Sequence, residues 1–206
     1  MPFIGNQPSA VPLTSADITD GIITSAKIAD GTIVNADINA SAAIASTKLS
    51  GSFGITEADQ WRLTTNSTGA LNPIASNFER NDSTAFAYIG SGMTQSSGIF
   101  TFPSTGIYLV RFIGLVAGPE TSRYNVGAIE VTTNNSSYTE VARFSAFLYN
   151  VGTTSNSGVC ESYVDVTSTS NVKVRFKFDP ADVTDWLEGS TTSNMTHFTF
   201  IRLGDT

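Results

Sequence analysis

Residues 96–112, SSGIFTFPSTGIYLVRF, contain two short apolar and aromatic runs separated by Pro103, Ser104, Thr105 and Gly106. Aromatic and β-branched residues favour strands, whereas proline and glycine are typical of the turns between them. We therefore predict one strand over residues 98–102 and a second over residues 107–115.

The same pattern continues on both sides of this stretch. Val174, Phe176 and Phe178 alternate with Lys173, Arg175 and Lys177, as in a strand with one buried face. Further strands are predicted over residues 85–89, 125–132, 141–148, 160–166, 171–178 and 196–203. Eight antiparallel strands in about 130 residues favour a mainly β protein with a jelly-roll sandwich. An immunoglobulin-type sandwich is the alternative, although it more often has seven strands.

The stretch that runs from residue 98 to residue 108 resembles a signature of the trimeric jelly-roll family that includes the complement component one heads and the tumour-necrosis-factor ligands. The matching residues are Gly98, Phe100, Pro103, Gly106, Ile107 and Tyr108. The segment MTHFTFIRLGD, residues 195–205, is similar to the aromatic last strand of that family. The resemblance implies a homotrimeric head, with Tyr108, Phe198 and Phe200 near its axis.

A different pattern occupies residues 15–49, where an apolar residue returns about every five positions. These residues are Ile18, Ile23, Ile28, Ile33, Ile38, Ile44 and Leu49. Five residues advance a helix by about 140° net and reverse the face of a strand, so neither form gathers the set on one side. The dipeptides Asp20-Gly21 and Asp30-Gly31 indicate turns ten residues apart. The unit is therefore ten residues, with a helical turn over residues 25–30 and a short strand over residues 32–34 of one unit.

A ten-residue unit cannot bury its own isoleucines, and repeats of this kind bury them by stacking. We therefore predict that residues 14–50 form an intertwined homotrimeric stalk with these seven apolar residues in its core. A weakly ordered tail is the alternative, but disordered segments do not place isoleucine at a fixed spacing.

Residues 51–73 are predicted to form a hinge and a short helix. Gly51 and Gly54 favour a loose connection, and Thr56 with Asp59 resembles a capping box. Good helix formers follow, so the helix is expected over residues 57–64. Trp61 is interpreted as a packing residue beneath the head, which is expected to span residues 74–206.

The segments PFIGNQPS and GITEADQWRLTT resemble the opening of tail-fibre and other fibre-like virion proteins of bacteriophages, especially cyanophage-like ones from marine bacteria. In those proteins an N-terminal peptide docks on the virion, a thin trimeric stalk follows, and a β-rich head lies at the tip. The resemblance implies an extended anchoring peptide over residues 1–13, with Phe3, Ile4 and Pro8 as anchors. Pro2, Pro8 and Pro12 exclude a continuous helix there.

Composition narrows the possible functions. A net charge of −7 argues against nucleic-acid binding, and the single cysteine, Cys160, excludes an intrachain disulfide framework. No signal peptide or membrane-inserting segment is predicted, so we expect synthesis in the host cytoplasm. Localisation in the virion is what the resemblance to phage fibre proteins implies. No nucleophile, phosphate-binding or zinc motif is present, and His197 lies in a predicted apolar strand. The chain is therefore predicted not to be an enzyme.

Two groups of residues are candidates for binding at the loops. Asp179, Asp182, Asp185 and Glu188 are weak candidates for Ca²⁺, although their spacing is not that of an EF-hand and a solvated loop is favoured. No other cofactor is expected. The residues of the predicted loops that we expect to face a receptor are Glu120, Arg123, Thr153, Asn156 and Trp186.

The favoured function is a trimeric phage fibre whose head recognises a host cell-surface glycan or protein. Its partners would be its own copies and other virion proteins of the tail or capsid. A capsid decoration or head-fibre protein without a receptor role is the alternative. A polysaccharide-degrading enzyme is less favoured, because such fibres are usually far longer.

Overall fold

A computed structural model describes residues 14–39, 41–44, 48, 54–119, 122–149 and 152–206. The chain divides into two units, residues 1–51 and 52–206, which are described separately. No helix among the described residues has the length and apolar character needed to cross a bilayer. The predicted anchors Phe3, Ile4 and Pro8, together with Leu49 of the expected stalk core, lie outside the described residues.

The N-terminal unit repeats one local conformation every ten residues. Three 3₁₀ turns begin ten residues apart: η1 Ser15–Asp17, η2 Ser25–Lys27 and η3 Asn35–Asp37. The turn expected within residues 25–30 is therefore confirmed at η2. The strand expected over residues 32–34 is wrong, because Thr32 N donates to Ala29 O at 3.1 Å in a second turn. Gly31, at φ 76°, reverses the chain there, and its counterpart Gly21 has φ 77°.

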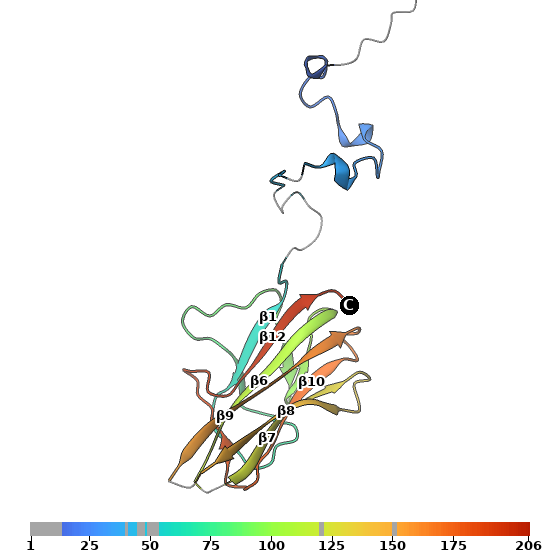
Figure 1. The fold of residues 1–206 in the computed structure, drawn as a ribbon. Helices are drawn as coiled ribbons and strands as arrows, with labels where there is room; N and C mark the ends of the chain where they lie inside the picture. The colour runs from blue at the N-terminus through green and yellow to red at the C-terminus, as the bar shows by residue number, and fades with distance from the viewer. Residues whose placement is uncertain (1–13, 40, 45–47, 49–53, 120–121, 150–151) are drawn as a thin grey trace, which may run out of the picture. The chain divides into compact units, whose positions relative to one another are not determined.

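The C-terminal unit is an antiparallel β-sandwich (Figure 1). Its strands are β1 Ala58–Leu63, β2 Ser67–Thr68, β3 Phe78–Arg80, β4 Thr94–Ser96, β5 Ile99–Thr101, β6 Gly106–Gly118, β7 Ser122–Thr132, β8 Thr139–Leu148, β9 Thr154–Val166, β10 Lys173–Asp179, β11 Trp186–Leu187 and β12 His197–Gly204. The first sheet has the order β2-β11-β6-β12-β1-β3, with β9 also paired to β6, and the second has the order β4-β5-β10-β7-β8. The predicted mainly β sandwich is confirmed.

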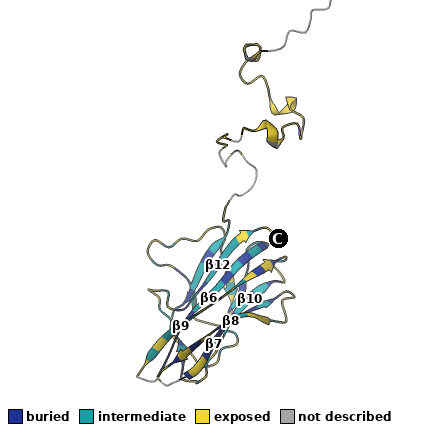
Figure 2. Cartoon of the chain, viewed as in Figure 1, coloured by how far each residue is buried: buried dark blue, intermediate teal, exposed yellow. Residues whose placement is uncertain are grey.

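Aromatic side chains from both sheets fill the space between them. Phe112 and Phe198 belong to the first sheet, and Phe100 and Phe176 belong to the second. The ring centroids of Phe176 and Phe198 lie 4.3 Å apart across the sandwich, and those of Phe112 and Phe198 lie 4.9 Å apart. This core appears in Figure 2 as the dark blue residues of the strands. Each of these side chains is almost completely removed from water, so the cluster is the main apolar contribution to head stability.

The predicted positions of Tyr108, Phe198 and Phe200 near a trimer axis are corrected by the structure. Their exposed fractions are 1%, 0% and 1% within a single chain. They point into the sandwich because alternate residues of β6 and β12 face its interior. They therefore belong to the core and are not available to a second chain.

Seven of the eight predicted strands overlap β5, β6, β7, β8, β9, β10 and β12. The prediction of a strand over residues 85–89 is wrong. Ala85 has φ 66°, which interrupts an extended chain, and only Ile89 makes a single bridge, to Ala58. The short strands β2, β3, β4 and β11 were not predicted.

The predicted helix over residues 57–64 is also wrong, because Ala58–Leu63 form β1. This strand pairs with β12 on one side and β3 on the other. Asp59, Trp61 and Leu63 point inward, and Trp61 packs edge-on against Phe100 with the ring centroids 5.6 Å apart. Helix propensity is a weak preference that pairing with distant strands overrides. The interpretation of Trp61 as a packing residue is consistent with these contacts.

Arg62 of β1 is fully buried beneath two loops on the outer side of the first sheet. Its Nε donates to Glu79 Oε1 at 2.6 Å, and its Nη1 donates to Ser83 Oγ at 2.8 Å and Asn81 Oδ1 at 3.2 Å. Its Nη2 donates to Asp82 and to the backbone carbonyl of Thr191. One guanidinium therefore joins β1 to residues 79–83 and to residue 191.

Candidate interaction surfaces

The isoleucines of the N-terminal unit are exposed in the single chain. Backbone bonds repeat every ten residues: Asp17 N to Thr14 O, Lys27 N to Thr24 O and Asp37 N to Val34 O lie between 2.9 and 3.0 Å. These bonds are local and bring no second segment over the apolar side chains. The regularly spaced residues Ile18, Ile23, Ile28, Ile33, Ile38 and Ile44 are between 39% and 53% exposed. We call these six residues the isoleucine row, and they belong to the N-terminal unit, whose described residues Figure 2 draws in yellow as exposed.

A second exposed apolar surface lies where the two sheets meet at strands β8 and β9. Phe144 points inward at this corner, where a Cβ on Gly158 or Gly127 would lie 2.0 or 2.2 Å from its ring. Glycine is therefore needed at both positions, and the outward side chains alternate with this inward contact. These outward residues, which we call the β8–β9 edge, are Val141, Phe147, Tyr149, Val159 and Tyr163. Phe147 is 65% exposed and Tyr163 is 70% exposed, so the edge is an unusual aromatic surface.

The outer face of the first sheet is also apolar. Along β6 the residues that point away from the core are half-buried, and they are joined by one residue of β12. We call this set the aliphatic face: Ile107, Leu109, Ile113, Leu115 and Ile201. Exposed Arg111 and Glu161 form an ion pair beside it, with Nη2 and Oε2 2.6 Å apart.

Sequence reasoning missed both head surfaces. A signal was present in ARFSAFLYN, residues 142–150, where inward positions are already occupied by Phe144, Ala146 and Leu148. Phe147 then places an aromatic residue on the solvent side of the same strand, where a polar residue is expected.

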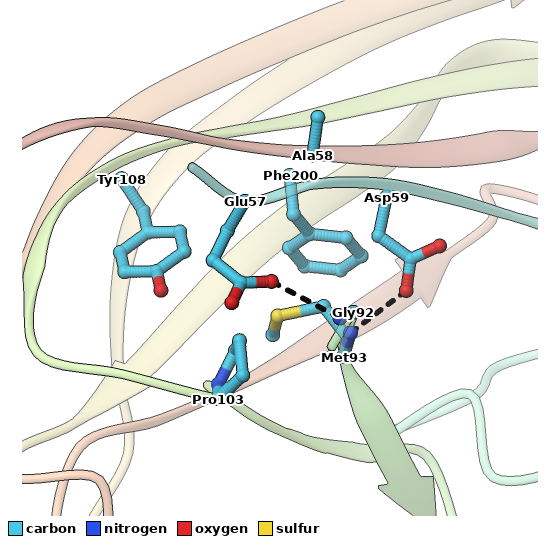
Figure 3. Close-up of a pocket in the computed structure, with 8 residues that line it drawn as sticks. All are labelled: Glu57, Ala58, Asp59, Gly92, Met93, Pro103, Tyr108 and Phe200. Atoms are coloured by element: carbon cyan, nitrogen blue, oxygen red, sulfur yellow. Dashed lines mark hydrogen bonds between the residues drawn. The ribbon is translucent and has the colours of Figure 1, made fainter. Parts of the chain in front are cut away.

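The carboxylates of Glu57 and Asp59 lie together beneath residues 91–93, but they hold the chain rather than line a binding cavity (Figure 3). Glu57 Oε2 accepts the N–H groups of Ser91 and Gly92 at 2.9 and 3.1 Å. Asp59 Oδ2 accepts from Met93 N at 2.7 Å and from Trp61 Nε1 at 2.9 Å. The space that these side chains share with Tyr108 and Phe200 is too small for a water molecule. The arrangement fits a structural role, because Glu57 Oε2 and Asp59 Oδ2 each already accept at least two hydrogen bonds from the chain.

The chain's histidine and cysteine are both withdrawn from solvent. Burial lowers the pKa of His197, and the nearby charge of Arg111 lowers it further. Burial raises the pKa of Cys160 to about 12, and its thiol lies 3.9 Å from the carbonyl of Gly127. The thiol of Cys160 is therefore protonated at neutral pH and is not a nucleophile there.

We expect Cys160 in the folded protein to resist iodoacetamide at pH 8 and to react fully in denaturant, because only the thiolate is nucleophilic. The folded pKa lies above the unfolded value, so the folded state holds the proton more tightly between about pH 9 and pH 12. This contribution to stability is present below the unfolded pKa and is lost as pH rises through the folded pKa. Mass spectrometry after timed labelling checks the prediction, and rapid labelling of native protein would contradict it.

The acidic residues after β10 have separate partners. Asp185 is fully buried and accepts from Ser122 Oγ, whereas Asp182 is exposed and accepts from Thr184 N at 2.8 Å. Asp179 lies 3.6 Å from Lys177 Nζ. Among the described residues, no three His, Cys, Asp or Glu side chains gather so as to hold a metal ion. The weak Ca²⁺ candidates, Glu188 included, are therefore not brought together.

We accordingly expect millimolar Ca²⁺ to leave the unfolding temperature unchanged, apart from general screening. Asp182→Asn should respond in the same way as the unaltered protein. Calorimetric scans with Ca²⁺ and with chelator compare the two conditions. A rise of several degrees that disappears in Asp182→Asn would contradict this expectation.

The structure brings most of the predicted receptor-facing residues to one end of the sandwich. Gly118 pairs with Thr154, Ser122 with Leu148 and Trp186 with Ala117, so three loops meet there. Arg123 and Thr153 are exposed, Trp186 is partly buried in β11, and Asn156 donates Nδ2 to Phe147 O at 3.0 Å. Glu120 lies outside the described residues. We call this end the loop end.

No protein-family model and no curated protein matches the sequence. Solved structures do resemble the sandwich. Murine APRIL at pH 5.0 has a TM-score of 0.53 and 12% identity over 71% of this chain and 98% of its own. Eiger TNF from S. frugiperda has a TM-score of 0.53 and 13% identity, and the match covers 72% of this chain and 93% of Eiger TNF. These likenesses show the fold alone, a β-sandwich of the tumour-necrosis-factor type.

Proposed function

We propose that the chain is a homotrimeric fibre protein of a bacteriophage virion. Its N-terminal peptide attaches to the particle, its repeats form the stalk, and its sandwich head contacts the host surface. The observation that carries the proposal is the isoleucine row, which leaves six regularly spaced isoleucines in solvent unless further copies cover them. The resemblance of residues 3–65 to phage fibre proteins supports the location in a virion.

The head supplies two different apolar surfaces for the same association. The β8–β9 edge is largely aromatic, whereas the aliphatic face lies on the outer side of the first sheet. Contact between two unlike surfaces of one chain is heterologous, and it closes into a ring when the rotation between copies is a whole fraction of a turn. In the proposed trimer, the edge of each head packs on the aliphatic face of the next.

We expect Phe147→Ser combined with Tyr163→Ser to weaken this head contact in the full chain. Each aromatic side chain contributes about 1.5–3 kcal/mol when it is fully buried. Light scattering over a dilution series should show the double variant dissociating at a higher concentration than the unaltered protein. Val183→Ser is a matched control, because Val183 is 76% exposed but belongs to neither apolar surface. Equal dissociation of the double variant and the control would contradict the proposed head contact.

The location is tested on particles. Gold-labelled antibody to the head should mark isolated virions, and deletion of residues 1–13 should leave a folded trimer that no longer joins them. Purified protein should also compete with phage for adsorption to host cells. Labelling at the capsid without such competition would favour a decoration protein without a receptor role. Particles without label would overturn the virion assignment.

A further inference from the structure

One position of the repeat changes sign from each unit to the next. The last residue of each 3₁₀ turn directly precedes an isoleucine, and these residues are Asp17, Lys27 and Asp37. The sequence continues the alternation with Lys48, which directly precedes Leu49. The apolar positions repeat every ten residues, whereas the charges repeat only every second unit. The described members, Asp17, Lys27 and Asp37, are exposed in the single chain.

The local structure favours aspartate at this position. Asp17 Oδ2 accepts the N–H of Thr14 at 2.8 Å and its hydroxyl at 2.7 Å, and Asp37 Oδ2 accepts the N–H of Val34 at 2.9 Å. Thr24, at the start of η2, makes no such side-chain cap. Lys27 cannot accept a hydrogen bond, and its Nζ instead donates to Ile22 O at 2.7 Å. The second unit therefore lacks a favourable local bond that its neighbours have, which points to a different role for Lys27.

We infer that Lys27 forms ion pairs with Asp17 or Asp37 of a neighbouring copy and thereby sets the register of the stalk. The inference rests on the proposed association of copies through the repeat. In a parallel threefold arrangement, the same residue of all three chains lies at one height along the stalk. Unlike charges of two chains therefore meet diagonally, between positions one unit apart along the stalk. Lys27 is the one basic residue between residues 14 and 44, so these pairs have a defined cation.

Charge alternation distinguishes registers between which the isoleucines of residues 18–38 discriminate only weakly. If one chain slips by ten residues, Ile18, Ile23 and Ile28 meet Ile28, Ile33 and Ile38 of its neighbours, so apolar packing is kept over this part of the repeat. The same slip places Asp17 and Lys27 of that chain at the heights of Lys27 and Asp37 of its neighbours, so that like charges meet on the diagonals. Asp20 and Asp30 lie in equivalent turns and carry the same sign, so they give no such discrimination. The alternation thus disfavours the slipped assembly, as interchain charges do in other repetitive assemblies.

The variant Lys27→Asp gives opposite results under the two interpretations. If only local bonds matter, the new aspartate caps Thr24 as Asp17 caps Thr14, and the trimer becomes more stable. If Lys27 pairs across chains, the variant carries an acidic residue at this position in three consecutive units, and these charges repel one another between chains. Its dissociation temperature then falls by several degrees. Raising the salt concentration to about 1 M should reduce that difference, because the Debye length falls to about 3 Å.

The experiment uses the full chain and follows dissociation by light scattering during heating. Asp17→Asn with Asp37→Asn removes two charges but keeps an amide oxygen for the cap, and it should lower the dissociation temperature. Asp20→Asn with Asp30→Asn removes two charges and keeps a turn dipeptide, and it should not. Chains that carry Lys27→Asp should form mixed trimers with chains that carry both Asp17→Lys and Asp37→Lys. The dissociation temperature of these mixed trimers should approach that of the unaltered protein.

The inference is overturned if Lys27→Asp remains trimeric and dissociates at the same or a higher temperature. It is also overturned if the two asparagine pairs behave alike. A monomeric mass for the unaltered protein would instead refute the proposed association itself, and the charge pairing with it. Mass is therefore measured before the variants are compared.

Discussion

A chain that carries Ile28→Asp should lose the association of its repeat segment. Burying one isoleucine contributes about 1.5–3 kcal/mol, so three copies at one level contribute roughly 5–9 kcal/mol in a trimer. The carboxylates that replace them would also oppose burial. Limited proteolysis should then cleave residues 14–50 much faster than in the unaltered protein, while the head remains intact.

Ala29→Asp is the matched control for this prediction. It adds the same charge one residue away, at a position where the neighbouring units have Thr19 and Asn39. Polar residues are therefore accommodated there, and cleavage should be nearly unchanged. Equal resistance of Ile28→Asp and Ala29→Asp to protease would show that the isoleucine row is not buried by other copies.

Arg62→Met should strongly destabilise the head. The guanidinium is fully buried and bonds to Glu79, Asn81, Asp82, Ser83 and the carbonyl of Thr191. Removal of one partner from a buried ion pair costs about 3–5 kcal/mol. The side chains of Glu79 and Asp82 are 29% and 77% exposed and can be solvated, so we expect a cost near the lower end of that range. Denaturant unfolding of the full chain, followed by tryptophan fluorescence, measures the change in the free energy of unfolding.

Arg143→Met serves as the comparison. Arg143 lies 3.7 Å from Glu140 with 69% of its side chain exposed, so its loss should cost less than about 1 kcal/mol. If the two variants unfold at the same denaturant concentration, Arg62 does not have the stabilising role that its contacts indicate.

The parts of the fold that could be predicted are those in which the local sequence pattern indicates which residues are buried. In β10, Val174, Phe176 and Phe178 alternate with charged residues, so the strand and its buried face follow from a few positions. The ten-residue repeat could be predicted equally well, because its backbone hydrogen bonds span no more than three residues.

Strand β1 could not be predicted in this way. Its local residues favour a helix, and its extended form depends on pairing with β12, as in the contact of Trp61 with Phe198. The pairing of β11 with β2, through Trp186 and Thr68, likewise depends on segments far apart in the chain. A local sequence pattern does not indicate which strands pair when they lie this far apart in the chain.

The candidate surfaces were predicted only in part. The spacing of the isoleucines indicated a row that needs partners. In the first sheet, by contrast, both Phe112 and Ile113 are apolar neighbours on β6, and composition alone cannot tell which faces the core. The position of Tyr108 near a trimer axis was implied by the family resemblance, whereas its ring packs against Phe102 inside the sandwich, with the centroids 4.8 Å apart.

The local closure of each repeat has a consequence for how a gene of this kind can change length. Because the backbone hydrogen bonds of one unit do not depend on the next, adding or removing ten residues leaves these bonds intact in every other unit. An alteration of five residues would keep the isoleucines at their spacing, but it would exchange the 3₁₀ turn for the turn at the Asp-Gly dipeptide. The segment can therefore become longer or shorter in steps of ten residues, by duplication or loss of whole units, and each unit keeps the same local conformation.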